Sequence, residues 1–201
     1  MNRKSPLPRQ VRIIAGEWKR TPLPVIEAHG LRPTPDRVRE TVFNWLEHLQ
    51  QRQWENRRCL DLFAGTGALG FEAASRGAAK VVMVESNAPA CRALQATKEK
   101  LGAVQLDIYQ GDAASRMAAL NIEFDVVFLD PPYDDQSLPV FLPACKRLLT
   151  AAGLVYIESD QPFATSSLPD WLSGWQLVRS DKAGAVHFAL ISKEQSRGMS
   201  D

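Results

Sequence analysis

From residue 59 onward, short apolar runs alternate with longer segments whose apolar positions recur every three to four residues. The short runs, rich in Val, Ile, Leu and Phe, are typical of buried strands, and the longer segments are typical of amphipathic helices. The predicted strands cover residues 59–63, 80–85, 105–109, 124–129 and 154–159. A first predicted helix follows the first strand and ends at residue 74, and two further helices cover residues 88–101 and 138–149. This alternation predicts an α/β fold with a mostly parallel sheet and helices on both faces.

The C-terminal part of the chain departs from this alternation. Residues 175–180 and 185–192 predict two further strands, joined around residues 182–184, where Gly184 favours a turn. Two strands connected this closely must run antiparallel. The predicted sheet therefore has seven strands and ends in an antiparallel hairpin.

The N-terminal part has a different pattern. Residues 11–20 predict a short hairpin that turns at Ala15–Gly16. Residues 21–35 contain four prolines and predict a stiff linker. Thr34 then occupies the position of a helix N-cap, with Pro35 at the first helical position.

Charge is distributed unevenly between these parts. Residues 1–58 carry 12 Lys and Arg against 6 Asp and Glu, whereas residues 59–201 carry 12 against 17, although the whole chain has a net charge of only +1. We therefore expect a basic N-terminal arm, hairpin and helix over 1–58, a catalytic α/β domain over 59–193 and a polar tail over 194–201. A basic segment on an acidic body favours contact with a polyanion through the N-terminal part, although a solvated basic face has the same composition.

Basic and aromatic residues meet in the predicted hairpin. Arg12, Lys19 and Arg20 lie along it beside Trp18, and this combination suits a nucleic-acid backbone and a stacked base. Arg39, which lies off the apolar stripe of the following helix, joins this predicted RNA-contact set. A small edge hairpin with a solvated basic face is an equally good interpretation of the pattern alone.

Bulk composition is that of a soluble globular protein, with 45% hydrophobic and 23% charged residues. The sequence has no apolar run of the roughly 18 residues that a membrane span needs, and its polar start does not resemble a signal peptide, so a cytoplasmic location is expected. Cys59, Cys91 and Cys145 are widely spaced, which favours reduced, packed thiols over a disulfide or a zinc site. We expect no metal.

A glycine loop follows the first predicted strand. Gly65 and Gly67 allow the backbone to turn tightly and to approach a ligand closely. A glycine loop in this position also suits a dinucleotide, but Asp61 inside the strand would repel a pyrophosphate and attract the ammonium of an aminoacyl group. This acid favours S-adenosylmethionine over NAD.

Two further acids end the next predicted strands. Glu85 closes the second strand, 20 positions after Gly65, where an acid can accept both ribose hydroxyls of an adenosine. Asp112 follows the third strand and is predicted to accept a hydrogen bond from the adenine amino group. Asp112 is the weaker of the two assignments, because a Gly-Asp pair is also typical of a turn.

The segment Asp130-Pro131-Pro132-Tyr133 follows the fourth predicted strand. Asp130 and the carbonyl of Pro131 can each accept a hydrogen bond from an exocyclic amine, which directs the nitrogen lone pair toward a methyl sulfonium. Tyr133 can stack on a base that has left its helix. The segment therefore predicts methylation of an amine on a nucleic-acid base.

This segment is similar to the (Asp/Asn)-Pro-Pro-(Tyr/Phe) motif of amino-methyltransferases. Together with residues 12–20, 31–46 and 61–70, it makes the chain resemble the RsmD family of bacterial 16S rRNA guanine-N2 methyltransferases, from about Arg12 to Ile191. The resemblance implies a class I methyltransferase (Rossmann-like) fold with a small N-terminal hairpin and helix extension. It also implies S-adenosyl-L-methionine as the methyl donor and 16S rRNA of the small ribosomal subunit as the partner; we expect a monomer.

Residue roles follow from the same resemblance. The implied donor site comprises Asp61, Gly65 and Gly67 for the aminoacyl part, Glu85 for the ribose and Asp112 for the adenine. The implied guanine site comprises Asp130, Pro131 and Tyr133, and Arg32 and Thr34 are placed over the donor and the target base. Many members have Phe after Pro-Pro where this chain has Tyr133, an exchange that preserves stacking.

Three other functions fit parts of this pattern. Adenine-N6 methylation of DNA or RNA would use the same Asp-Pro-Pro-Tyr segment, although the sequence shows no separate DNA-specificity domain. A ribosome-assembly factor without turnover would use the same basic residues, but would not require Asp130 and Glu85. An NAD-dependent oxidoreductase conflicts with Asp61.

Overall fold

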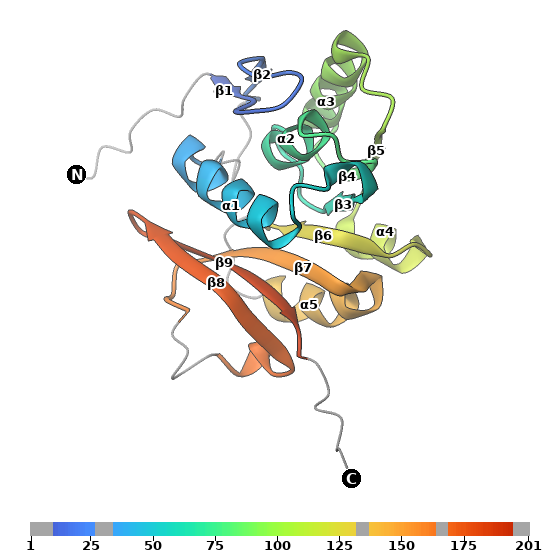
Figure 1. The fold of residues 1–201 in the computed structure, drawn as a ribbon. Coiled ribbons are helices and arrows are strands. Elements are labelled where there is room, and N and C mark those ends of the chain that lie inside the picture. Colours follow the sequence, from blue (N-terminus) through green and yellow to red (C-terminus); the bar gives the residue numbers. More distant parts are fainter. Residues whose placement is uncertain (1–9, 27–33, 132–136, 164–168, 195–201) are drawn as a thin grey trace, which may run out of the picture.

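The computed structural model of the protein describes residues 10–26, 34–131, 137–163 and 169–194, which form a central sheet of seven strands (Figure 1). The strands are β3 Arg58–Asp61, β4 Lys80–Glu85, β5 Leu106–Gln110, β6 Phe124–Leu129, β7 Leu149–Ser159, β8 Trp175–Ala183 and β9 Val186–Lys193. They lie in the order β5-β4-β3-β6-β7-β9-β8. The first five are parallel, and β9 runs antiparallel to β7 and β8. The predicted fold class is confirmed.

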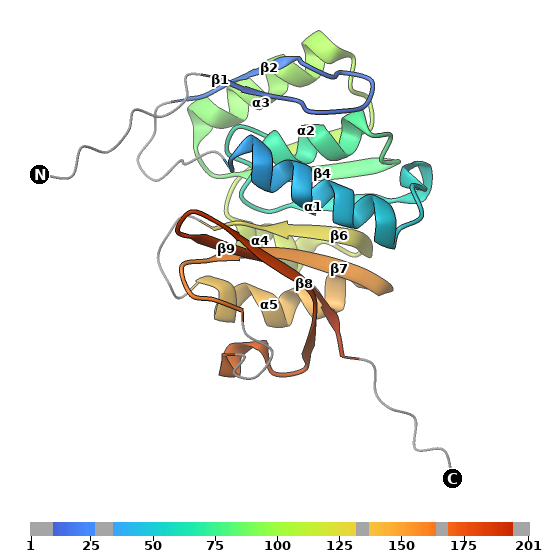
Figure 2. The same ribbon diagram turned by 60° about the vertical axis from the view of Figure 1, so that its left-hand side comes forward.

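Helices cover both faces of this sheet (Figure 2). In the described ranges they are α1 Asp36–Leu49, α2 Ala68–Ser75, α3 Ala88–Leu101, α4 Ala113–Ala119 and α5 Ser137–Leu148, with 3-10 turns at Trp54–Asn56 and Asp170–Leu172. Helices α1, α2 and α3 contribute to one apolar core, and α4 and α5 contribute to the other. The short helix α4 was not predicted. None of the helices described is both long enough and apolar enough to cross a membrane.

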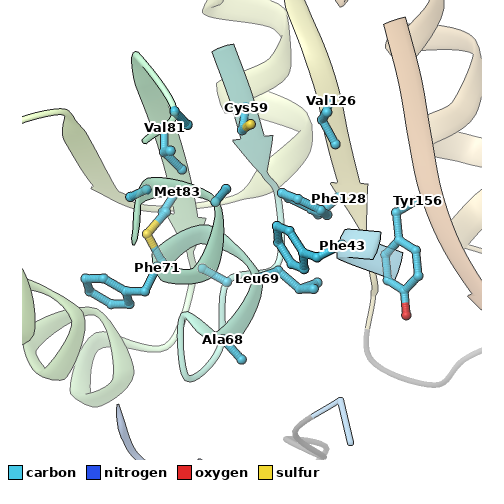
Figure 3. Packing of buried hydrophobic residues seen from close by; sticks show 14 of the residues in the cluster. Phe43, Cys59, Ala68, Leu69, Phe71, Val81, Met83, Val126, Phe128 and Tyr156 are labelled. Carbon is cyan, nitrogen blue, oxygen red and sulfur yellow. The ribbon is translucent and has the colours of Figure 1, made fainter. Parts of the chain in front are cut away.

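Successive side chains of the central strands enter the two cores in turn. Cys59 and Val126 point toward α1 and α2, as Figure 3 shows, whereas Leu60 and Val127 enter the core beneath α4 and α5. Strands buried on both faces need apolar residues at nearly every position. This burial explains why these strands appear in the sequence as continuous apolar runs.

The N-terminal hairpin differs from its prediction. Strand β1 Gln10–Arg12 pairs with β2 Pro22–Pro24, so the return strand lies beyond residue 20, and the predicted linker starts as a strand. Prolines are tolerated there because an edge strand does not need every backbone N–H. The intervening loop is long because it docks on α2, with the Glu17 N–H donating to the Ser75 carbonyl at 2.8 Å.

Glu72 of α2 anchors that loop. Its carboxylate has no exposed side-chain surface and accepts hydrogen bonds from the backbone N–H groups of Ile14, at 2.6 Å, and Ala15, at 3.0 Å. The next residue, Gly16, has a φ of +82°, and a Cβ on it would lie 1.9 Å from the Ser75 carbonyl oxygen. The loop and α2 therefore fit together only with glycine at this position.

Arg39 is part of the same buried contact, and its prediction as an RNA-contact residue is wrong. Its side chain has no exposed surface, and its Nη2 donates to Asp36 Oδ1 at 2.7 Å and to the Arg12 carbonyl at 2.9 Å. Its Nη1 lies 3.9 Å from Glu72 Oε2. Local periodicity could not show this burial, because the Arg12 carbonyl and Glu72 come from other segments of the chain.

Candidate active site

Acidic residues gather at the carboxyl edge of the sheet. Asp61 ends β3, Glu85 ends β4, Asp130 follows β6, and Glu158 is the penultimate residue of β7. These four strands are neighbours in the sheet. Ligands of open α/β sheets bind beyond this edge. The fold thus brings together three acids that the sequence analysis selected and adds a fourth, Glu158.

The glycine loop between β3 and α2 is held by two of these acids. The Gly65 N–H donates to Glu85 Oε2 at 2.7 Å, and the Gly70 N–H donates to Asp61 Oδ2 at 3.0 Å. Gly67 precedes α2 with a φ of +77°, and a Cβ on it would lie 2.5 Å from the ring of Phe71. Glycine is therefore required at position 67 by the packing of the core, and the loop is fixed from both sides.

Asp61 is nearly as buried as the core around it, at 3% exposure. Burial raises its pKa to about 7, against the opposing effect of the Gly70 hydrogen bond, and the charge of Glu85 raises it further. Such a carboxyl costs the native state free energy when it ionises. A cationic ligand group beside it would reduce that cost.

This raised pKa predicts how stability depends on pH. Between the unfolded pKa of 3.8 and the folded pKa of about 7, the native protein holds a proton that the unfolded chain has lost, so stability falls as pH rises. The free energy of unfolding of Asp61→Asn minus that of the wild type is therefore expected to increase by roughly 2 to 3 kcal/mol between pH 5 and pH 8. Urea unfolding of both proteins at the two pH values measures this. An equal difference at both values would contradict it.

Asp112 has a structural role at the end of β5. Its side chain is exposed, and its Oδ2 accepts a hydrogen bond from the Ser115 N–H at 2.8 Å, which caps α4. This hydrogen bond lowers the pKa of Asp112. Because a carboxylate can accept several hydrogen bonds, the cap leaves acceptor capacity for a ligand.

Asp130 lies beside the start of α1. Thr34 does not cap this helix: Pro35 occupies the N-cap position, and no side-chain cap is present. The Thr34 hydroxyl donates instead to Asp130 Oδ2, at 3.3 Å. Burial, followed by the charges of Glu158 and Asp61, raises the pKa of Asp130. The helix start is therefore joined to the acid that the motif singled out.

Glu158 is the site residue that sequence analysis missed. Its Oε1 accepts a hydrogen bond from the Tyr156 hydroxyl at 2.5 Å, and it remains partly exposed. Burial raises its pKa, as it does for Asp130. The one sequence feature that could have indicated Glu158 is its position as an acid near the end of a predicted strand. Pro131 is partly exposed beside Asp130, whereas Arg32 and Tyr133 lie outside the described residues.

Exposed basic residues lie in and beside the docked loop, residues 13–21, which joins β1 to β2. Lys19 and Arg20 are exposed, and Trp18 is half-buried against the core that contains α1 and α2. Arg12 is also exposed, and its Nε lies 3.2 Å from Asp36 Oδ2. An ion pair this exposed contributes little to stability, so Arg12 can exchange it for another anion.

The cysteines take no part in this edge. All three are buried and free, and burial raises the pKa of the Cys145 thiol to about 12. Among the described residues, no three His, Cys, Asp or Glu side chains group in a way that could hold a metal ion.

The strand order and the acidic carboxyl edge define a protein of the class I methyltransferase fold. The solved structure of the Escherichia coli protein yhhF matches with a TM-score of 0.78 and 33% identity, over 93% of this chain and 99% of that one. An RNA methyltransferase from Salinibacter ruber, in complex with S-adenosyl-L-homocysteine, matches with a TM-score of 0.62 over 84% of this chain and 99% of that one. At 18% identity, this second likeness concerns the fold alone.

Sequence comparison identifies the family. The family described as Conserved hypothetical protein 95 matches residues 11–192. The Ribosomal RNA small subunit methyltransferase D of Escherichia coli K12 is 37% identical over 96% of this chain and 94% of its own length. The protein of the same name from Haemophilus influenzae is 35% identical over 90% of this chain and 93% of its own length. The chain belongs to this family, and the resemblance to the RsmD family is confirmed.

Proposed function

We propose that this protein transfers a methyl group from S-adenosylmethionine to the exocyclic N2 amine of a specific guanine in 16S rRNA. The observation that carries the proposal is the placement of Asp130 directly after β6, the neighbour of β3, where the charge of Asp61 at the end of β3 acts on it. Relatives that match nearly the whole chain are named as small-subunit rRNA methyltransferases, which supports the choice of RNA.

The residues at the carboxyl edge of the sheet suit this donor. The acid at Asp61 can face an ammonium, and Glu85 stands where an acid can accept ribose hydroxyls. Asp112, with capacity beyond its helix cap, is assigned to the adenine amino group. When bound, S-adenosylmethionine supplies a methyl group on a positively charged sulfonium.

The chain's own residues then position the base. Asp130 accepts a hydrogen bond from one N–H of the amine and Pro131 accepts the other through its carbonyl, so that the nitrogen lone pair faces the donor. The raised pKa of Asp130 also suits it to hold the proton that the amine loses. Tyr133, Arg32 and Thr34 keep their assigned roles at the base and the donor.

Mass spectrometry of 16S rRNA tests the proposal. RNA from cells that lack the gene is expected to lose one N2-methylguanosine, and the purified protein is expected to restore it on small-subunit particles from those cells. Methyladenosine as the product would point to the N6 alternative. Absence of any methyl transfer to small-subunit particles or free 16S rRNA would refute the proposal.

The exposed basic residues of the docked loop give a prediction for RNA binding. The pair Lys19→Glu plus Arg20→Glu is expected to weaken binding of 16S rRNA. It should also flatten the salt dependence of binding, lowering the slope of log K against log salt by about one for each phosphate that the protein no longer neutralises. Filter binding at several salt concentrations measures this, and affinity for S-adenosylhomocysteine should not change.

The matched control is Arg179→Glu plus Lys182→Glu, which makes the same charge change at exposed positions of the C-terminal hairpin. If both pairs weakened binding equally, the effect would be one of overall charge, and the N-terminal loop would not be a contact surface.

A further inference from the structure

Glu158 stands next to Asp130 on the same face of the sheet. Strands β6 and β7 are parallel neighbours, with Phe128 opposite Tyr156 and Leu129 opposite Ile157. The rings of Phe128 and Tyr156 lie on one face with centroids 6.3 Å apart (Figure 3). Because side chains alternate along a strand, Asp130 and Glu158, each two positions further on, continue that face beyond the rings.

Hydroxyl groups orient both carboxyls. Tyr156 donates to Glu158 Oε1 at 2.5 Å, and Thr34 donates to Asp130 Oδ2 at 3.3 Å. Both acids are partly exposed, so a ligand can reach them. The two carboxyls therefore form a fixed pair of acceptors at the edge of the sheet.

The pair has no evident structural purpose. Among the described residues, no Lys, Arg or His forms an ion pair with Asp130 or Glu158. Two partly buried carboxyls placed side by side without a cation disfavour each other's ionisation. A ligand that offers two adjacent donors would relieve this repulsion.

Guanine offers that pattern on its Watson–Crick edge, where the N1–H lies next to the N2 amine. Adenine offers an amine next to an unprotonated N1, which would face a carboxylate with its lone pair. Two carboxylates match the first edge and oppose the second. We propose that Glu158 is a specificity-determining residue that accepts the N1–H of guanine while Asp130 accepts its N2 amine. This inference rests on the proposed function.

The test uses 2-aminopurine, which keeps the N2 amine but has no N1–H. Small-subunit particles are reconstituted with 16S rRNA that carries either guanine or 2-aminopurine at the mapped position, and kcat/KM is measured for both. The wild type is expected to prefer guanine by about ten- to hundredfold, the size of a hydrogen bond to a charged group. Glu158→Gln should reduce this preference to within about threefold of unity, because its amide can donate to N1 as well as accept from it.

Controls separate specificity from folding. Glu158→Gln should retain the unfolding temperature and the S-adenosylhomocysteine affinity of the wild type, and Glu158→Ala, which also lacks the acceptor, should lose the preference too. Asp160→Asn removes a nearby exposed acid and should leave the preference unchanged.

The outcomes distinguish this inference from the proposed function. If Glu158→Gln and Glu158→Ala both methylate guanine with the wild-type preference, Glu158 does not read N1 and the inference fails alone. If the wild type methylates neither base, the proposed function fails and the inference fails with it.

Discussion

Replacing Asp130 by alanine is expected to lower kcat for methylation of small-subunit particles by about 100-fold or more, because the amine loses the acceptor that aligns it. Affinity for S-adenosylhomocysteine should stay close to that of the wild type, since Asp61 and Glu85 hold the donor loop. Rapid-quench turnover and calorimetry on the same preparations measure the two quantities.

The same substitution should not lower the free energy of unfolding. Burial and the charges of Glu158 and Asp61 raise the pKa of Asp130, so at neutral pH its ionisation costs the native state free energy that alanine avoids. Asp160→Ala, at an exposed position nearby, is the control for loss of one acid. Full methylation by Asp130→Ala would show that this carboxyl does not position the amine.

Glu72→Ala is expected to destabilise the protein by about 3 to 5 kcal/mol, as removal of one partner from a buried ion pair does. The change would leave two backbone N–H groups of the docked loop without their acceptor. It would also remove the buried acid that pairs with Arg76 at 2.7 Å and faces Arg39. Urea unfolding measures the loss. Glu40→Ala, at an exposed position of α1, should change stability by less than about 0.5 kcal/mol.

A double variant tests the physical cause. Arg39→Met combined with Glu72→Met should recover part of the loss, because it also removes a buried guanidinium whose one remaining acid, Asp36, is partly exposed, although the loop N–H groups remain unsatisfied. If the double variant were no more stable than Glu72→Ala, the cost would come from the loop hydrogen bonds rather than from the guanidinium of Arg39.

Elements with strong local signals were predicted with their observed bounds. Strands β4 and β6 are mostly apolar, each with four consecutive apolar residues. Helix α3 has a side-chain cap from Asn87, which accepts from Ala90, and is followed by Gly102 with a φ of +62°. Helix α4 has seven residues, too few to establish a period, and its capping acid Asp112 was interpreted only as a ligand residue. Length and local signals therefore decided which elements could be found.

The acids of the site show a different limit. Asp61 and Glu85 could be selected from the sequence because the glycine loop fixes their spacing along the chain. Glu158 was missed because its meaning depends on β7 lying beside β6, which is a property of the folded sheet. Arg39 was misplaced for the same reason, since Glu72 faces it from another helix. Sequence patterns predict what one segment does, and contacts between segments need the fold.

The docking of the N-terminal part on α2 limits how this chain can be shortened. Phe43 of α1 packs against Phe128 of the sheet with ring centroids 5.7 Å apart, and Trp54 also packs against Phe43, at 5.8 Å. A chain that began at residue 59 would expose this apolar face and would leave Glu72 with Arg76 but without Arg39 and the loop N–H groups. Residues 34–58 thus form one wall of the catalytic body, and truncation there would yield an insoluble protein rather than a smaller enzyme.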